Sequence, residues 1–176
     1  MGKLVNFVTS LHKATKRKYI DRMLDDKVNC MLKAKQYEFD YWDGDRRYGY
    51  GGYKYIPGRW KSVAEQLIKH YNLSNGSSLL DIGCGRGEFL VHFGAGSVGI
   101  DSDAERAEFL RRLGIEIVEG NFEDDISVPD GTFDAVWCTD VLEHVLSPHL
   151  LLRRAHRKLK EHGLLFIGIP TVPSSR

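Results

Sequence analysis

Leu79-Leu80-Asp81-Ile82-Gly83-Cys84-Gly85-Arg86-Gly87 is a short apolar run that ends in three alternating glycines. The run is typical of a buried parallel strand. We expect Gly83 to allow a sharp turn, Gly85 to let the backbone approach a ligand, and Gly87 to let the next helix pack closely. The spacing G-x-G-x-G differs from the dinucleotide pattern G-x-G-x-x-G, and Glu88 would repel a pyrophosphate. Both features disfavour a nicotinamide-dependent dehydrogenase.

Strand and helix patterns alternate around this loop. Such alternation predicts an α/β fold, in which a Rossmann-like, mostly parallel sheet carries helices on both faces. The predicted strands are Ser78–Ile82, Ser97–Ile100, Ile115–Val118, Phe133–Cys138 and Leu164–Ile169. The predicted helices are Ser62–Tyr71, Glu88–Phe93, Ala104–Leu113 and Leu150–Leu159, with Leu142–Val145 opening a further helical stretch.

The pattern divides the chain into a leader, residues 1–60, and a core, residues 61–176. In the leader, Lys3–Lys18 and Asp21–Phe39 are predicted to be helical. The stretch Tyr37–Trp60 holds nine of the nineteen aromatic residues together with five glycines. It is either an aromatic loop packed on the core or a lid that covers a ligand site, and the sequence leaves both open.

Composition narrows the class of partner. The net charge of +1 over 176 residues gives no reason to expect a nucleic-acid partner. No apolar run approaches the ~20 residues that span a bilayer, so we expect no membrane association. The three cysteines, Cys30, Cys84 and Cys138, include no C-x-x-C pair, which indicates neither a disulfide framework nor a metal site. A reduced, cytoplasmic location fits this use of cysteine.

Asp101 stands at the end of the second predicted strand, eighteen residues after Gly83. A carboxylate there can accept hydrogen bonds from both ribose hydroxyls of a bound nucleoside. Taken alone, an aspartate at this point would sooner be interpreted as the cap of the helix that follows. Its distance from the glycine loop favours the ribose interpretation.

These segments together resemble the motifs of class I S-adenosylmethionine-dependent methyltransferases. Asp81–Gly87 is similar to motif I, and Val98–Asp101 is similar to the next motif with its ribose-binding acid. Gly120–Glu123 resembles the adenine loop, Phe133–Val145 the fourth-strand motif, and Leu159–Leu165 the turn into the fifth strand. The similarity covers about residues 61–170, and the motifs occur in the family's order.

The resemblance implies S-adenosylmethionine as the cofactor, with S-adenosylhomocysteine as the product. The implied contacts are Gly83, Gly85 and Asp81 near the methionine and ribose end, Asp101 on the ribose, Ser102 beside the adenine, Asn121 on the adenine amine, Phe122 against the adenine ring, and Asp140 near the sulfonium. The family often has an acid in place of Asn121. Arg59 either pairs with the methionine carboxylate or forms a salt bridge on the leader.

Methyl transfer needs mainly alignment and exclusion of water, because the cofactor already carries the activation. A base is needed only for a protonated acceptor, and His144 is the candidate catalytic residue. In the family, a Glu-His pair at this point commonly serves the fold or a helix cap instead.

The family's core usually has seven strands, whereas this sequence stops after the fifth. The chain is then a fragment, a short form whose open edge is covered by the leader or a second copy, or a binder without transfer activity. An open edge invites association, so a homodimer is possible. We expect a small-molecule or sugar acceptor. The alternative is a non-catalytic S-adenosylmethionine-binding or assembly module, and the absence of an Asn-Pro-Pro-Tyr run disfavours nucleic-acid methylation.

Overall fold

The computed structural model describes residues 5–7, 24–36, 38–42, 44–45, 47–48, 57–74, 76–124 and 127–169. The chain forms two compact units, Met1–Pro57 and Gly58–Arg176. In the first unit, α3 spans Lys27–Ala34 and α4 spans Phe39–Trp42. The single helix predicted over Asp21–Phe39 is therefore wrong as a continuous element. Apart from residues 5–7, which are irregular, the predicted helix Lys3–Lys18 lies outside the described residues.

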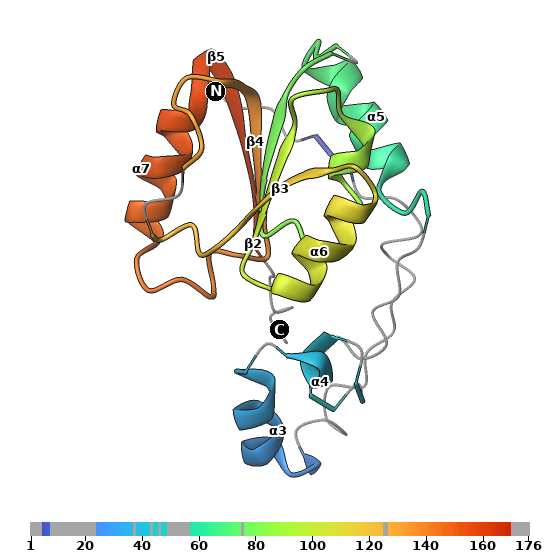
Figure 1. The fold of residues 1–176 in the computed structure, drawn as a ribbon, viewed down its shortest axis with the longest axis vertical. Coiled ribbons are helices and arrows are strands. Elements are labelled where there is room, and N and C mark those ends of the chain that lie inside the picture. The colour runs from blue at the N-terminus through green and yellow to red at the C-terminus, as the bar shows by residue number, and fades with distance from the viewer. Residues whose placement is uncertain are drawn as a thin grey trace. The chain divides into compact units, whose positions relative to one another are not determined.

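The second unit is built on a five-stranded, all-parallel sheet with the order β3-β2-β1-β4-β5 (Figure 1). This arrangement confirms the predicted Rossmann-like α/β class. The strands are β1 Leu79–Ile82, β2 Val98–Asp101, β3 Glu116–Glu119, β4 Phe133–Thr139 and β5 Leu159–Gly168.

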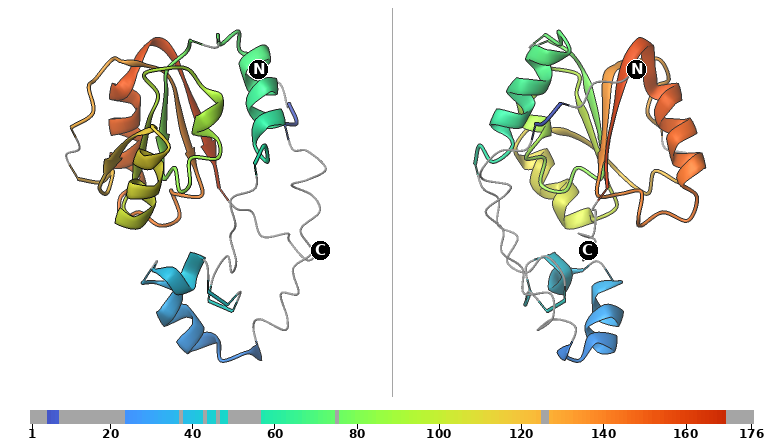
Figure 2. Two further views of the ribbon diagram at one scale, coloured as in Figure 1. Left: turned by 45° about the vertical axis from the view of Figure 1, so that its right-hand side comes forward. Right: turned by 180° about the vertical axis from the view of Figure 1, so that it is seen from behind.

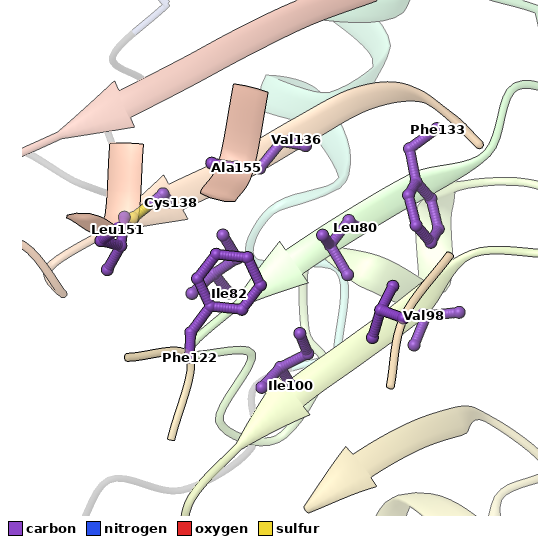
Figure 3. Packing of buried hydrophobic residues seen from close by; sticks show 11 residues of the cluster. Leu80, Ile82, Val98, Ile100, Phe122, Phe133, Val136, Cys138, Leu151 and Ala155 are labelled. Atoms are coloured by element: carbon purple, nitrogen blue, oxygen red, sulfur yellow. The ribbon is translucent and has the colours of Figure 1, made fainter. Parts of the chain in front are cut away.

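Helices cover both faces of the sheet. One face carries α5, Lys61–His70, and α6, Ala104–Arg112, while α7, Pro148–Lys158, lies on the other (Figures 1 and 2). A main hydrophobic cluster joins α7 to the sheet, and Figure 3 shows its buried side chains. It contains Leu80, Ile82, Val98, Ile100, Phe122, Val128, Phe133, Val136, Cys138, Leu151 and Ala155. Towards α6, a smaller cluster contains Cys84, Ala107, Leu110 and Ile117.

The crossover from β1 to β2 contains no α-helix, so the helix predicted over Glu88–Phe93 is wrong. A single 3₁₀ turn, η1 Leu90–His92, stands in its place. The glycines at 87 and 94 leave too few residues between them to nucleate a stable helix. Aromatic packing fixes the short segment instead, because the ring of Phe89 stacks on Trp137 at 4.0 Å and meets Trp60 edge-on at 6.0 Å.

Two other boundaries differ from the prediction. The stretch Leu142–Val145 forms turns, and α7 begins only at Pro148, a residue that suits a first helical position. β5 begins at Leu159, five residues before the predicted start, because Leu159 already pairs with Phe133 across an irregular register. Among the described residues, β5 pairs with no strand but β4, and the possible homodimer stays a prediction.

Gly85 and Gly87 provide a test of the loop's packing. Both have positive φ, +54° and +67°. A Cβ at Gly87 would lie 2.7 Å from Leu110 Cδ2, whereas one at Gly85 would meet nothing within 4 Å. We therefore expect Gly87→Ala to lower the free energy of unfolding by roughly 2–4 kcal/mol, from backbone strain plus overpacking, and Gly85→Ala by about 1–2 kcal/mol from strain alone. Urea denaturation of both variants measures the difference, and equal losses would contradict the described packing.

Candidate functional site

The candidate site lies where the parallel strands end. The glycine loop leaves β1, Ser102 follows β2, Asn121 follows β3, and Asp140 follows β4. The chain passes from β1 to β2 and β3 on one side and to β4 and β5 on the other, so the connections change direction between β1 and β4. In open α/β sheets, ligands bind outside the carboxyl ends of the strands at such a switch point. The topology thus gathers most of the predicted site residues at one edge.

Main-chain hydrogen bonds hold the glycine loop against the end of β2. The N–H groups of Gly83 and Cys84 both donate to the carbonyl oxygen of Ile100, at 2.8 and 3.1 Å. The N–H of Gly85 donates to Asp101 Oδ2 at 2.8 Å, and the N–H of Asp103 donates to Asp101 Oδ1 at 2.9 Å. The carboxylate of Asp101 is therefore fixed in orientation from both sides.

The cap of α6 is a different residue. Asp103 occupies the N-cap position, and its side chain accepts hydrogen bonds from the N–H groups of Glu105 and Arg106. Asp101 lies two residues earlier, at the last position of β2. The capping interpretation of Asp101 is thus wrong, because the helix already has its cap.

Asp81 is a second buried carboxyl group close to the loop, with only 3% of its surface exposed. Burial first, and then the nearby carboxyl of Asp101, raise the pKa of Asp81 well above its ordinary value. Burial also raises the pKa of Asp101, against the opposing effects of the N–H of Asp103 and the charge of Arg106. The site therefore holds two acidic groups whose surroundings disfavour negative charge.

The segment after β4 packs directly on the glycine loop. A Cβ added to Gly83 would lie 2.5 Å from Val141 Cγ2. Asp140 has a left-handed backbone with φ of 56°, and its N–H donates to the carbonyl oxygen of Gly168 at 3.0 Å. Non-glycine residues in this conformation cluster at functional sites. The structure thus brings Asp140 and Gly83 to neighbouring positions.

The loop after β3 is attached to Asp101 through the backbone, since the N–H of Gly120 donates to the carbonyl oxygen of Asp101 at 2.9 Å. Asn121 is exposed, and its Oδ1 accepts from the N–H of Glu123 at 3.0 Å. The side chain of Phe122 is 5% exposed and belongs to the core cluster (Figure 3), so it anchors this loop. Its contact with the adenine ring stays a prediction.

Arg59, Ser102 and His144 are the remaining predicted site residues. The Nε of Arg59 is buried and has no hydrogen-bond partner among the described residues. No described ion pair corresponds to the salt bridge considered for it. Ser102 is exposed directly after Asp101. The side chain of His144 is 36% exposed, with its Nε2 3.9 Å from Glu143 Oε1.

Two residues that the sequence did not single out tie the loop after β3 to α7. Glu123 accepts from the N–H groups of Leu146 and Ser147, at 3.1 and 2.7 Å. Arg154 donates from Nη1 to the carbonyl oxygens of Phe122 and Asp124, at 3.0 and 2.6 Å. Partners more than twenty residues apart leave no local sequence signal. An acid three residues after the N-cap would have signalled a capping box, but Glu123 lies far outside that range.

Within the described residues, no group of His, Cys, Asp and Glu side chains could hold a metal ion. Cys84 and Cys138 are buried free thiols. Burial raises the pKa of Cys138 to about 12, which keeps that thiol protonated and unreactive. In the same part of the chain, no helix is long and apolar enough to cross a membrane.

A family model described as a methyltransferase domain matches residues 54–176. The chain belongs to this family. The match covers the whole sheet, the glycine loop and the acid at the end of β2, and it confirms the resemblance drawn from the motifs.

Curated relatives include ubiquinone biosynthesis O-methyltransferases. The one from Xanthomonas oryzae pv. oryzae is 37% identical over 102 residues, which are 53% of this chain and 43% of the relative. The one from Maricaulis maris is 29% identical over 140 residues, covering 72% of this chain and 55% of the relative. The chain therefore spans about half the length of the curated relatives it matches.

Solved structures show the same fold. A candidate methyltransferase from Bacillus halodurans superposes with a TM-score of 0.54 at 23% identity, over 64% of this chain and 52% of that one. A SAM-dependent methyltransferase from Aquifex aeolicus gives a TM-score of 0.50 at 23% identity, over 65% of this chain and 72% of that one. At these identities the likeness establishes the fold of the methyltransferase domain alone.

The buried carboxyl of Asp81 predicts a pH dependence of stability. A carboxyl whose pKa is higher in the folded than in the unfolded chain binds more protons in the folded state. Its contribution to stability is then lost as pH rises from the ordinary value of 3.8 through the raised pKa. We expect Asp81→Asn to be more stable than the wild type near pH 8, with the gap shrinking towards pH 4. Urea denaturation across this range measures the gap, and a gap that widens towards acid would contradict the assignment.

Proposed function

We propose that this methyltransferase domain binds S-adenosylmethionine at the carboxyl edge of the sheet and transfers its methyl group to a small-molecule or sugar acceptor. The observation that carries the proposal is the fixed carboxylate of Asp101 beside Gly85. Both oxygens of Asp101 are oriented by backbone N–H groups, and the space next to Gly85 is open to at least 4 Å from where its Cβ would stand. A nucleoside can approach such a backbone closely and meet an acceptor for its ribose hydroxyls.

The surrounding residues fit the rest of the cofactor. The buried, unpartnered Nε of Arg59 is a donor suited to the methionine carboxylate. Asp81 and Gly83 would line the methionine end, and Asp140 would lie near the sulfonium. Ser102 would flank the adenine. Asn121 is exposed in the loop after β3, and its side-chain amide would form a hydrogen bond with the amine edge of the adenine.

When bound, S-adenosylmethionine supplies an activated methyl group on a positively charged sulfur. The chain's own residues would orient the cofactor and enclose it. Asp101 holds one end of the site through a carboxylate that needs no rearrangement, and Val141 closes against Gly83 on the other side. Alignment of this kind supplies much of the barrier reduction in transfer reactions.

The relatives named as O-methyltransferases support an oxygen atom as the acceptor. A hydroxyl acceptor must lose its proton, and His144 is our candidate base. Its ring is partly exposed in the segment after β4, and an imidazole nitrogen is the commonest proton acceptor in general base catalysis. The second candidate function is a non-catalytic S-adenosylmethionine-binding module.

The three cysteines of the described chain are free, buried thiols, which supports a reducing compartment such as the cytoplasm. The balanced charge supports a small-molecule partner over a nucleic acid.

Calorimetric titration of S-adenosylmethionine into the folded chain tests the proposal. We expect micromolar binding to the wild type. Asp101→Asn should weaken it by roughly 10- to 100-fold, because a charged hydrogen-bond acceptor for two hydroxyls is lost.

Asp124→Asn is the matched control, since it removes an exposed carboxylate near the site whose side chain has no assigned contact with the cofactor. It should bind as the wild type does. His144→Asn should also bind normally, because its proposed role is towards the acceptor. Absence of binding by folded wild-type protein, or equal binding by Asp101→Asn, would overturn the proposed cofactor site.

A further inference from the structure

The start of α7 is capped from a distant loop. Ser147 holds the N-cap position, but its side chain makes no capping hydrogen bond. The first turn of a helix leaves N–H groups without intrahelical partners. Glu123 supplies the acceptor from the loop after β3, with one carboxylate oxygen on the N–H of Ser147 at 2.7 Å and the other on the N–H of Leu146 at 3.1 Å. A carboxylate at this end of a helix is also stabilised by the helix dipole.

A second set of hydrogen bonds runs in the opposite direction. From the second turn of α7, Arg154 donates to the carbonyl oxygens of Phe122 and Asp124, which flank Glu123 in the loop. Glu123 of the loop thus binds the backbone at the start of α7, and Arg154 of α7 binds the backbone of the loop. We call Glu123, Arg154 and the four backbone groups that they contact the latch.

The latch joins two segments that both border the candidate site. On one side, the loop contains Asn121 and is attached to Asp101 through the N–H of Gly120. On the other side, the residues just before α7 contain Val141, which lies against Gly83, and His144.

We propose that Glu123 and Arg154 are positioning residues, which transmit cofactor binding at the loop after β3 to the segment 140–147 that faces the acceptor. The inference rests on the proposed cofactor site and adds a role for residues that do not touch the cofactor. When the loop is fixed by a nucleoside at Asn121 and Asp101, Glu123 is fixed with it. The N–H groups of Leu146 and Ser147 then have a rigid acceptor, and the segment 140–147 loses freedom before any acceptor arrives.

Amide hydrogen exchange, followed by NMR with and without S-adenosylhomocysteine, tests the transmission. In the wild type, the ligand should slow exchange of the amides in 83–87 and 120–124, and also those of 141–147. We expect the slowing at Leu146 and Ser147 to be at least about fivefold, the low end of coupling between sites. In Glu123→Ala, the slowing at 83–87 should persist, while that at 141–147 should fall below about twofold.

Three further variants make the test specific. Arg154→Gln removes the other half of the latch and should have the same effect, which provides a second measurement if Glu123→Ala fails to fold. Asp124→Asn and Arg153→Ala are matched controls, because each removes a charge adjacent to a latch residue while leaving the latch bonds in place. Both controls should behave as the wild type does.

The outcomes separate the coupling from the cofactor site. A purely structural role would speed exchange at 141–147 in the variants but leave the ligand-induced ratio unchanged, and that result would overturn the coupling. Slowing at 83–87 with none at 141–147 in the wild type would also overturn it, while the cofactor site would stand. No slowing anywhere in folded wild-type protein would overturn the proposed cofactor, and the coupling with it.

Discussion

The hydrogen bond from the N–H of Gly85 to the carboxylate of Asp101 is the interaction on which the candidate site depends. It joins the turn after β1 to the end of β2, and the other carboxylate oxygen is held by the N–H of Asp103. The backbone carbonyl oxygen of Asp101 also accepts a hydrogen bond from the N–H of Gly120, so the loop after β3 is attached to the same residue. Three strand ends are therefore positioned around one residue. A carboxylate arranged in this way is ready for a ligand without a further change of shape.

The short crossover between β1 and β2 covers the sheet without the predicted α-helix. Where an α-helix was expected, one 3₁₀ turn and a group of stacked rings cover the sheet. Trp137 stands opposite Asp81 in the sheet register, so these rings cover the same face as the buried acid. Apolar surroundings of this kind raise the pKa of Asp81 and keep water from the base of the loop. The same packing thus supports the fold and disfavours the charged form of Asp81.

Local patterns were sufficient for most of the fold. The apolar run into three glycines located β1 and its turn, and the spacing to Asp101 located the end of β2. Contacts between residues far apart in the sequence could not be predicted from local patterns. The sequence shows no sign that Phe122 turns into the core, that Asp103 rather than Asp101 caps α6, or that Glu123 caps α7 from 24 residues away. The helix expected at Glu88–Phe93 did not form because the glycines at 87 and 94 leave too short a segment between them, and ring packing fixes that segment instead.

A structure of the chain with bound S-adenosylhomocysteine tests the central claim most directly. The account predicts that both ribose hydroxyls lie within hydrogen-bond distance of the Asp101 carboxylate, with the main-chain path of Gly83–Gly87 unchanged. The Nε of Arg59 should lie near the methionine carboxylate. A nucleoside held elsewhere, or one that binds only after the glycine loop has left Asp101, would contradict the account.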